Sequence, residues 1–405
     1  MSDDRISKKG SLVARGALAL GIAALAFVVA QSSLAMALAE KDPARAAALD
    51  PGNAVALSNL ALAQLAAEGV DAERLEQVGA MATTAILADP SLPLAAVGAG
   101  LARGQREGEA SMVPAFRYAD ALSRRELPTN IWFIEDATAR GAIAVAMTYY
   151  DTAMRTSRNS KTLLFPRLVE SIGDPRYIAP LADTLARNPA WRTDFVQHAA
   201  QNAQDLDALG SLLVALERQG SPAAPLAVST TLDRFVAADD LAGAWRVYGA
   251  LNPEAARQPL RNGEFAVETD PATPFDWNFL QQSGVIAEPR ENERGANFFF
   301  SAPMDWAGPV ASQTLRLAPG SYRLIGSAYD LQLNDEERPY LALSCMGSPE
   351  EQRFDLPRSD EDGRAFTWQF SIPTNCAFQS LSIVLRAGNT PDGVQGWIEN
   401  LRIET

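Results

Sequence analysis

The first pattern along the chain is a run without charge from Gly16 to Ala39, 24 residues long, which follows a short basic stretch. About 20 apolar residues are enough to cross the hydrocarbon core of a bilayer as a helix. Basic residues that flank such a helix stay in the cytoplasm. Residues 1–39 therefore predict a cytoplasmic tip and a single transmembrane signal anchor in the inner membrane, with the rest of the chain in the periplasm.

A cleaved signal peptide is the alternative for the same run, because such peptides end in a small-x-small site. Ala35-Met36-Ala37 and Ala37-Leu38-Ala39 both fit that site. The length of the run favours an uncleaved anchor. Both interpretations place everything after residue 39 in the periplasm.

The second pattern, over residues 40–258, is a series of amphipathic segments in which apolar residues recur at helical spacing, as in Ile143, Met147, Tyr150 and Met154. Proline-containing breaks separate the segments. Pro51 and Pro90 are 39 residues apart, and Pro90 and Pro128 are 38 apart. Each interval has room for two helices that cannot bury their apolar faces alone, so we expect them to stack as an α-helical repeat solenoid.

Several of these segments resemble degenerate tetratricopeptide repeats. Ala146, Tyr150 and Ala153 match that family's core spacing of small and aromatic residues, and Ala244 and Tyr248 match part of it. The resemblance implies a scaffold without chemistry of its own, which binds other envelope proteins. We expect the aromatic residues of these helices to pack in the core, and we expect His198 to occupy an ordinary helical position.

The third pattern, over residues 259–405, consists of short runs rich in aromatic and β-branched residues between turn signals. About ten strands in this length predict an antiparallel β-sandwich of the jelly-roll type. Residues 318–321 predict a hairpin turn. The fold class is therefore α + β multidomain, with domains at 1–39, 40–258 and 259–405.

Four phrases of this last region resemble the galactose-binding-like and carbohydrate-binding-module jelly rolls: LRNGEF (260–265), PFDW (274–277), LAPGSYRL (317–324) and GWIENLRIE (396–404). The resemblance implies recognition of a sugar or glycan, often with a structural calcium ion. The acidic clusters 335–337 and 360–362 match no calcium-loop spacing, so we predict no catalytic cofactor or metal site and leave structural calcium open.

Alternation along the strands assigns side chains to faces. It places Trp368 in the core and predicts one outward face that combines aromatic rings, which stack on sugars, with Arg and Gln donors. Trp306 belongs to a loop and joins this candidate set, or else it closes one end of the sandwich. The predicted glycan-binding residues are Trp306, Arg323, Tyr329, Tyr340 and Gln369. The alternative is an ordinary solvated or helix-covered outer sheet.

Composition narrows the function further. The chain has 35 basic and 49 acidic residues, a net charge of −14, which argues against nucleic acid as a partner. The single histidine and two cysteines exclude a multi-histidine catalytic site and a cysteine zinc cluster. Cys345 and Cys376 are 31 residues apart in segments that we expect to be neighbouring strands, so an oxidising periplasm predicts a disulfide between them.

The sequence thus predicts a non-enzymatic, membrane-anchored periplasmic scaffold and binding protein, in which the jelly roll recognises a glycan or a partner protein. Envelope polysaccharide export or assembly suits this pairing of domains by analogy. One alternative is a carbohydrate-active enzyme with a carboxylate pair drawn from Asp276, Asp305 and Glu399. Another is a purely structural adaptor whose jelly roll has no glycan ligand.

Overall fold

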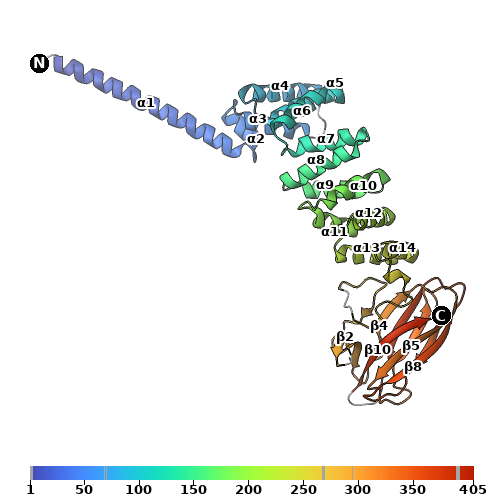
Figure 1. The fold of residues 1–405 in the computed structure, drawn as a ribbon. Coiled ribbons are helices and arrows are strands. Elements are labelled where there is room, and N and C mark those ends of the chain that lie inside the picture. The colour runs from blue at the N-terminus through green and yellow to red at the C-terminus, as the bar shows by residue number, and fades with distance from the viewer. Residues whose placement is uncertain (1–2, 68, 70, 267–269, 294, 389–392) are drawn as a thin grey trace. The chain divides into compact units, whose positions relative to one another are not determined.

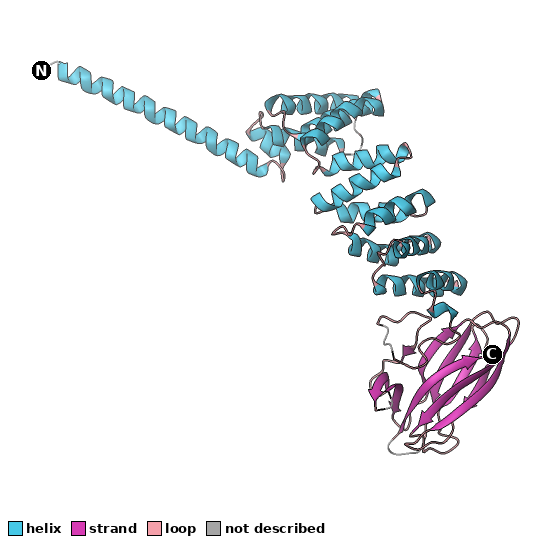
Figure 2. Ribbon diagram, viewed as in Figure 1, coloured by secondary structure: helices cyan, strands magenta, loops and turns pink. Residues whose placement is uncertain are grey.

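The computed structural model describes residues 3–67, 69, 71–266, 270–293, 295–388 and 393–405. Helices make up the first part of the chain, and two antiparallel sheets make up the last part (Figures 1 and 2). This confirms the predicted fold class. The chain divides into two compact units, Met1–Leu164 and Phe165–Thr405, so the second unit contains both helices and the sandwich. The predicted division at residues 258 and 259 lies inside that second unit and stays a prediction.

The first unit begins with one long helix and continues as antiparallel helix pairs. The two helices between Pro51 and Pro90, and the two between Pro90 and Pro128, occupy the intervals that the proline spacing predicts. The elements are α1 (Asp3–Leu38), α2 (Pro43–Leu49), α3 (Ala54–Leu65), α4 (Ala72–Ala88), α5 (Pro93–Glu107), the 3-10 helix η1 (Glu109–Met112), α6 (Val113–Leu122), α7 (Leu127–Ala139), α8 (Ile143–Thr156) and the start of α9 (Ser160–Ser171).

The long helix α1 contains a stretch, Arg15–Leu38, that is long and apolar enough to cross a membrane. Its last two turns also belong to the fold of the first unit. Ala35 and Ala39 are fully buried, and Ala39 shares a small core with Ala46 of α2 and Ala56 of α3. Asn59 donates a hydrogen bond of 3.0 Å from Nδ2 to the carbonyl of Ala39. The apolar segment is therefore continuous with the helical body.

Polar residues at the predicted breaks fix where several helices begin. Asn53 accepts a hydrogen bond from the amide of Ala56 at the start of α3, and Asp71 does the same for Arg74 at the start of α4. Such caps satisfy amides that have no partner within the helix. The boundaries of these helices thus follow from local chemistry.

A ladder of four aromatic rings runs across α6, α7 and α8. Phe116 stacks on Trp132 at 4.7 Å, and Phe133 stacks on Tyr149 at 4.6 Å. Trp132 meets Phe133 edge to face at 4.9 Å. Phe116 and Tyr150 are buried as expected, whereas Trp132, Phe133 and Tyr149 are only partly buried.

In the second unit, helices form two layers. Contacts connect α10 (Pro175–Ala186), α12 (Leu206–Arg218) and α14 (Leu241–Leu251) in one layer, and α11 (Arg192–Asn202) with α13 (Pro225–Ala237) in the other. A short helix η2 (Ala255–Arg257) ends the series. His198 occupies a half-buried position on α11, 5.5 Å from the ring of Phe165, as an ordinary helix residue would.

The sandwich has two five-stranded antiparallel sheets (Figure 2). The first sheet has the order β1-β4-β9-β6-β7, and the second has the order β2-β3-β10-β5-β8. The strands are β1 (Asn278–Phe279), β2 (Ile286–Asn292), β3 (Gly295–Ala302), β4 (Gly308–Leu315), β5 (Gly320–Tyr329), β6 (Tyr340–Cys345), β7 (Glu351–Asp355), β8 (Arg364–Ile372), β9 (Gln379–Leu385) and β10 (Val394–Glu404).

The core between the sheets follows the predicted alternation. Phe366, Trp368, Phe370 and Ile372 of β8 all point inward and are buried. Leu341 and Leu343 of β6 face them from the first sheet as part of one continuous core. A strand with one apolar face must bury that face, so alternation alone fixes the orientation of β8.

Two predicted details are wrong. Residues 318–321 do not form a hairpin turn, because β4 belongs to the first sheet and β5 to the second. The segment crosses from one sheet to the other. Cys376 lies in the turn between β8 and β9 and not in a strand, although its partner Cys345 does end β6. Turn residues such as Pro-Gly mark a change of direction, but they do not decide which strand pairs with which.

Candidate functional site

The outer face of the first sheet carries a hollow of about 700 Å³. It extends over strands β6, β7 and β9 and over the segment after β9, with β4 at one side. Its lining includes small, polar and charged side chains: Glu336, Tyr340, Ala342, Ser344, Glu351, Arg353, Ser380, Ser382, Val384 and Arg386. We take this surface as the candidate site.

Short side chains form the floor. Across the ladder, Ser382 of β9 is paired with Ala342 of β6, and Ser380 is paired with Ser344. On the other side of β9, Ser312 and Thr314 of β4 are paired with the same two serines and extend the polar surface. Because serine, alanine and threonine project so little from the sheet, the face stays hollow and presents rows of hydroxyl groups.

Tyr340 and two arginines build one wall. The guanidinium carbon of Arg353 lies 4.9 Å from the centroid of the Tyr340 ring, and that of Arg386 lies 4.6 Å from it. The tyrosine is only 9% exposed. The ring therefore serves to position two cations, and little of it remains for stacking on a ligand.

Carboxylates and carbonyls fix the two guanidinium groups. Arg386 donates from Nη2 to Asp355 Oδ1 at 2.5 Å and from Nη1 to the carbonyl of Arg338 at 3.0 Å. Arg353 donates to Glu351, and this hydrogen bond raises the pKa of the Arg353 guanidinium above its ordinary value. These contacts orient both guanidinium groups, and each retains further N–H donors.

The charges of the lining balance. Two carboxylates, Glu336 and Glu351, stand against two guanidinium groups, Arg353 and Arg386. With the floor hydroxyls, the hollow offers fixed donors and acceptors at neutral net charge. Such a surface is suited to a ligand rich in hydroxyl groups and without charge.

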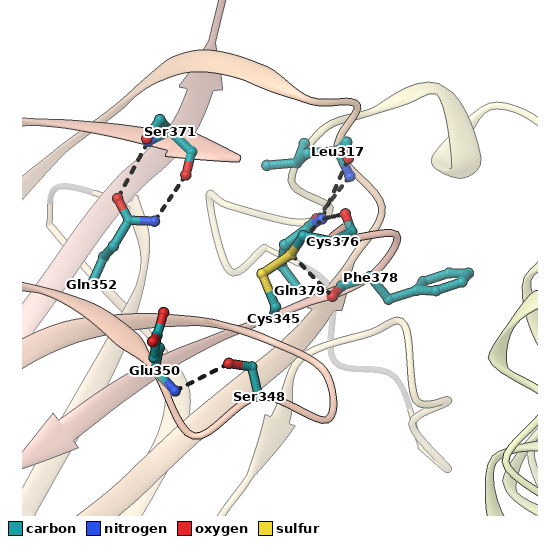
Figure 3. The surroundings of a disulfide bond; sticks show 9 residues. All are labelled: Leu317, Cys345, Ser348, Glu350, Gln352, Ser371, Cys376, Phe378 and Gln379. Atoms are coloured by element: carbon teal, nitrogen blue, oxygen red, sulfur yellow. Dashed lines mark hydrogen bonds between the residues drawn. A yellow bond between two sulfur atoms is a disulfide. The ribbon is translucent and has the colours of Figure 1, made fainter. Parts of the chain in front are cut away.

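A disulfide and several hydrogen bonds fix the end of β6 that carries Ser344 and Cys345. The disulfide between Cys345 and Cys376 confirms the predicted pairing, and their Cα atoms are 5.4 Å apart (Figure 3). Gln379 donates to the carbonyl of Cys376 at 2.8 Å and accepts from the amide of Leu317 at 2.8 Å (Figure 3). The β6 end next to Ser344 is thereby fixed.

A second cross-link joins the two sheets at their edges. Gln352 of β7 donates to the carbonyl of Ser371 of β8 at 2.8 Å and accepts from its amide at 3.3 Å (Figure 3). A side-chain amide thus replaces the backbone ladder between two edge strands, and it holds β7, which carries Arg353, in place.

The structure separates the predicted site residues. Tyr340 lies in the hollow, but Arg323, Tyr329 and Gln369 project from β5 and β8 on the outer face of the other sheet. Arg323 and Gln369 share a smaller hollow of about 490 Å³ at the edge of that sheet. The expectation that all four share one face is therefore wrong, because β6 joins the first sheet and β5 the second. A role of each residue in binding stays a prediction.

Trp306 lies in the loop between β3 and β4 and is half-buried against the sandwich core. Its ring covers Gly308, where an added Cβ would meet the indole at 3.3 Å. Gly308 has a φ of 152°, so the loop needs a residue without a side chain at that position. This geometry matches the interpretation in which Trp306 closes one end of the sandwich.

Sequence reasoning missed Ser380, Ser382, Arg353 and Arg386. A signal for the serines is present in QSLSIVL (379–385), where serine alternates with leucine and isoleucine along a strand. The arginines carry no such signal. Arg353 reaches the hollow because β7 pairs with β6, and Arg386 reaches it because it directly follows the end of β9. Their positions depend on which strands become neighbours.

The three carboxylates of the enzyme alternative come from separate elements. Asp276 precedes β1 and accepts a hydrogen bond from the Thr273 hydroxyl at 2.6 Å, Asp305 is exposed in the loop after β3, and Glu399 is buried in β10. Within the described part of the chain, no three His, Cys, Asp or Glu side chains are grouped so that they could hold a metal ion.

The chain matches no known family model and no curated protein. Solved structures show a distant likeness. One is the enzymatically active domain of tailspike protein 4 of bacteriophage CBA120, at 12% identity and a TM-score of 0.29, which covers 36% of this chain and 21% of that chain. This chain therefore spans about a fifth of the tailspike chain.

Two further structures are carbohydrate-binding modules. TmCBM61, solved in complex with β-1,4-galactotriose, is 14% identical with a TM-score of 0.27 and covers 36% of this chain and 98% of its own. The CBM22-1 xylan-binding domain of Paenibacillus barcinonensis Xyn10C is 12% identical with a TM-score of 0.24 and covers 35% of this chain and 90% of its own.

Proposed function

We propose that the sandwich binds a neutral glycan in the hollow on the outer face of its first sheet. The observation that carries this proposal is the floor of serine hydroxyls beside two oriented guanidinium groups. Sugar hydroxyl groups both donate and accept hydrogen bonds, and a rigid set of donors and acceptors can bind them without first being ordered. Strands hold such groups more firmly than loops do.

Charge favours a neutral ligand. The lining balances two carboxylates against two guanidinium groups. Over residues 259–405, 11 arginines and no lysines stand against 21 acidic residues, a net charge of −10. A domain of that charge repels anionic polysaccharide and anionic lipid at long range. Cation bridging is the one route by which an anionic glycan would bind.

Binding without catalysis is the function that the site supports best. Glycoside hydrolysis needs two carboxyl groups on either side of the scissile bond, one of them with a raised pKa. Asp276, Asp305 and Glu399 come from three separate elements. Glu351 in the hollow accepts a hydrogen bond from Arg353.

The helical part supports a second proposal, that the chain is anchored in the inner membrane with its body in the periplasm. Arg15–Leu38 has 24 residues. At 1.5 Å per residue this gives about 36 Å of helix, more than the ~30 Å of a hydrocarbon core. The end of α1 can therefore leave the bilayer and pack on α2 and α3, as Ala35 and Ala39 do.

The same arrangement supports a proposal for the role of the protein. Helix pairs that stack on one another present extended surfaces for other envelope proteins. A glycan-binding sandwich carried by a membrane-anchored helical scaffold would suit polysaccharide export or assembly in the envelope.

The test is a panel of neutral oligosaccharides titrated against the purified full chain in detergent micelles. Ser382→Tyr fills the hollow and is expected to weaken binding at least tenfold. Thr367→Tyr is the matched control, because Thr367 is exposed on the outer face of the second sheet. The proposal is wrong if no neutral oligosaccharide binds, or if Thr367→Tyr abolishes binding while Ser382→Tyr leaves it intact.

A further inference from the structure

A second hollow, of about 440 Å³, lies in the first unit between η1 and α7. Its floor is apolar, with Trp132 of α7 and Met112 and Val113 at the junction of η1 and α6. Its rim is acidic and is made of Glu109, Glu135 and Asp136. Neither the glycan-binding proposal nor the anchor uses this surface.

Trp132 is held firmly at the floor. Phe116 stacks on it at 4.7 Å with an interplanar angle of 21°, and Phe133 meets it at 4.9 Å with an angle of 80°. These two contacts hold the indole ring in place. The ring is nevertheless only half-buried, and its remaining surface lines the hollow.

The charged residues that line the hollow are all acidic. None of the residues that line the hollow is basic. Asp136 is already paired with Arg140 at 2.5 Å, so its charge is compensated locally. Glu109 and Glu135 are exposed at the rim, and they make the opening attractive to a cation.

We propose that this hollow binds an arginine or lysine side chain from a basic segment of a partner protein. Both side chains join an apolar stem to a cationic head. The stem would cover Met112 and Val113. The head would lie against the exposed part of the Trp132 ring, where cation–π attraction adds to that of the rim carboxylates. An acidic rim repels anionic lipid headgroups, so charge complementarity favours a basic polypeptide over a membrane surface.

Dye-labelled hexaarginine, titrated against the full chain in neutral detergent micelles, tests this directly. Hexacitrulline has the same shape without the charge and is expected not to bind. The double variant Glu109→Gln with Glu135→Gln is expected to weaken hexaarginine binding about tenfold. The matched control is Glu73→Gln with Glu76→Gln, which removes two exposed charges from α4.

The whole chain is acidic and attracts any basic peptide. The control variant therefore distinguishes binding at this hollow from general electrostatic attraction to the chain. Equal weakening by the two double variants would overturn the proposal, and so would binding of hexacitrulline. Trp132→Leu gives a second measurement that retains both rim charges. It is expected to weaken binding at least threefold, with helical content unchanged by circular dichroism. Unchanged affinity in a folded Trp132→Leu variant would also contradict the proposal.

Discussion

Arg261 lies beneath Trp245, with its guanidinium carbon 5.5 Å from the centroid of the indole ring. The two residues join the last long helix to the sandwich, because Trp245 belongs to α14 and Arg261 precedes the first strand. Arg261 is 3% exposed and donates to the carbonyls of Phe275 and Thr314. Phe275 in turn packs on Trp245 at 5.0 Å, so residues of the last helices and of the segment before β1 form one hydrophobic cluster, separate from the core between the sheets.

Replacing Arg261 should therefore destabilise both parts of the second unit together. Arg261→Ala leaves two carbonyls without donors and a cavity under Trp245, and we expect it to lower the free energy of unfolding by about 2–4 kcal/mol. Burial lowers the pKa of Arg261. Thermal unfolding measures the effect. Arg402→Ala, at an exposed position on β10, should change stability by less than about 0.5 kcal/mol.

The disulfide closes a loop of 31 residues. On the loop-entropy model its removal by Cys345→Ser with Cys376→Ser costs about 3–4 kcal/mol, because the unfolded chain regains freedom. Chemical denaturation with and without reductant measures this. Reductant should shift the midpoint of the wild-type chain and leave the double variant unchanged. The expectation would be contradicted if reductant frees both thiols of the wild-type chain and the midpoint of its denaturation does not change.

Tyr340 is expected to matter for glycan binding through the arginines that it positions. Tyr340→Ala removes the ring between Arg353 and Arg386, and we expect it to weaken the affinity for a neutral oligosaccharide about tenfold. Arg323→Ala and Gln369→Ala, on the other sheet, should leave the affinity within twofold. Titration calorimetry measures all three variants. If Arg323→Ala and Gln369→Ala weaken the affinity and Tyr340→Ala does not, the glycan binds on the second sheet instead.

Trp306 is expected to contribute to stability and not to affinity. Trp306→Ala uncovers Gly308 and part of the core, and a half-buried tryptophan should cost about 1–3 kcal/mol, less than a fully buried one. Unfolding and glycan titration on the same variant separate the two roles. Lost affinity without lost stability would show instead that the loop binds ligand.

The anchor proposal predicts that the mature protein keeps its first 39 residues. Intact-mass measurement of the chain purified from membranes should give the full-length mass, because Ala35 and Ala39 are buried against α2 and α3. Asn59→Ala removes the hydrogen bond to Ala39 and should reduce stability by about 1 kcal/mol without releasing the chain from the membrane. A mature chain that begins at Leu38 or Glu40 would contradict the anchor.

Periodicity predicted most of the architecture. The proline spacing from Pro51 to Pro128 gave the helix pairs, and alternation in β8 gave the buried row that contains Trp368. These inferences succeed because they depend on a helix or strand burying its own apolar face. Of the predicted glycan-binding residues, only Tyr340 lines the candidate hollow, because the face on which the others lie depends on which strands are neighbours.

The sequence by itself determined the apolar N-terminal helix, the change from helices to strands, the core-facing side of β6 and β8, and the pairing of the only two cysteines. The helix, the change to strands and the core-facing sides depend on local periodicity. The cysteine pairing has one solution because the chain has two cysteines. Only the tertiary structure decided that β5 and β6, successive along the chain, lie in opposite sheets, and that Ser382, Arg353 and Arg386 line one hollow with Tyr340. Strand order depends on long-range packing of the whole core, which no local pattern of residues encodes.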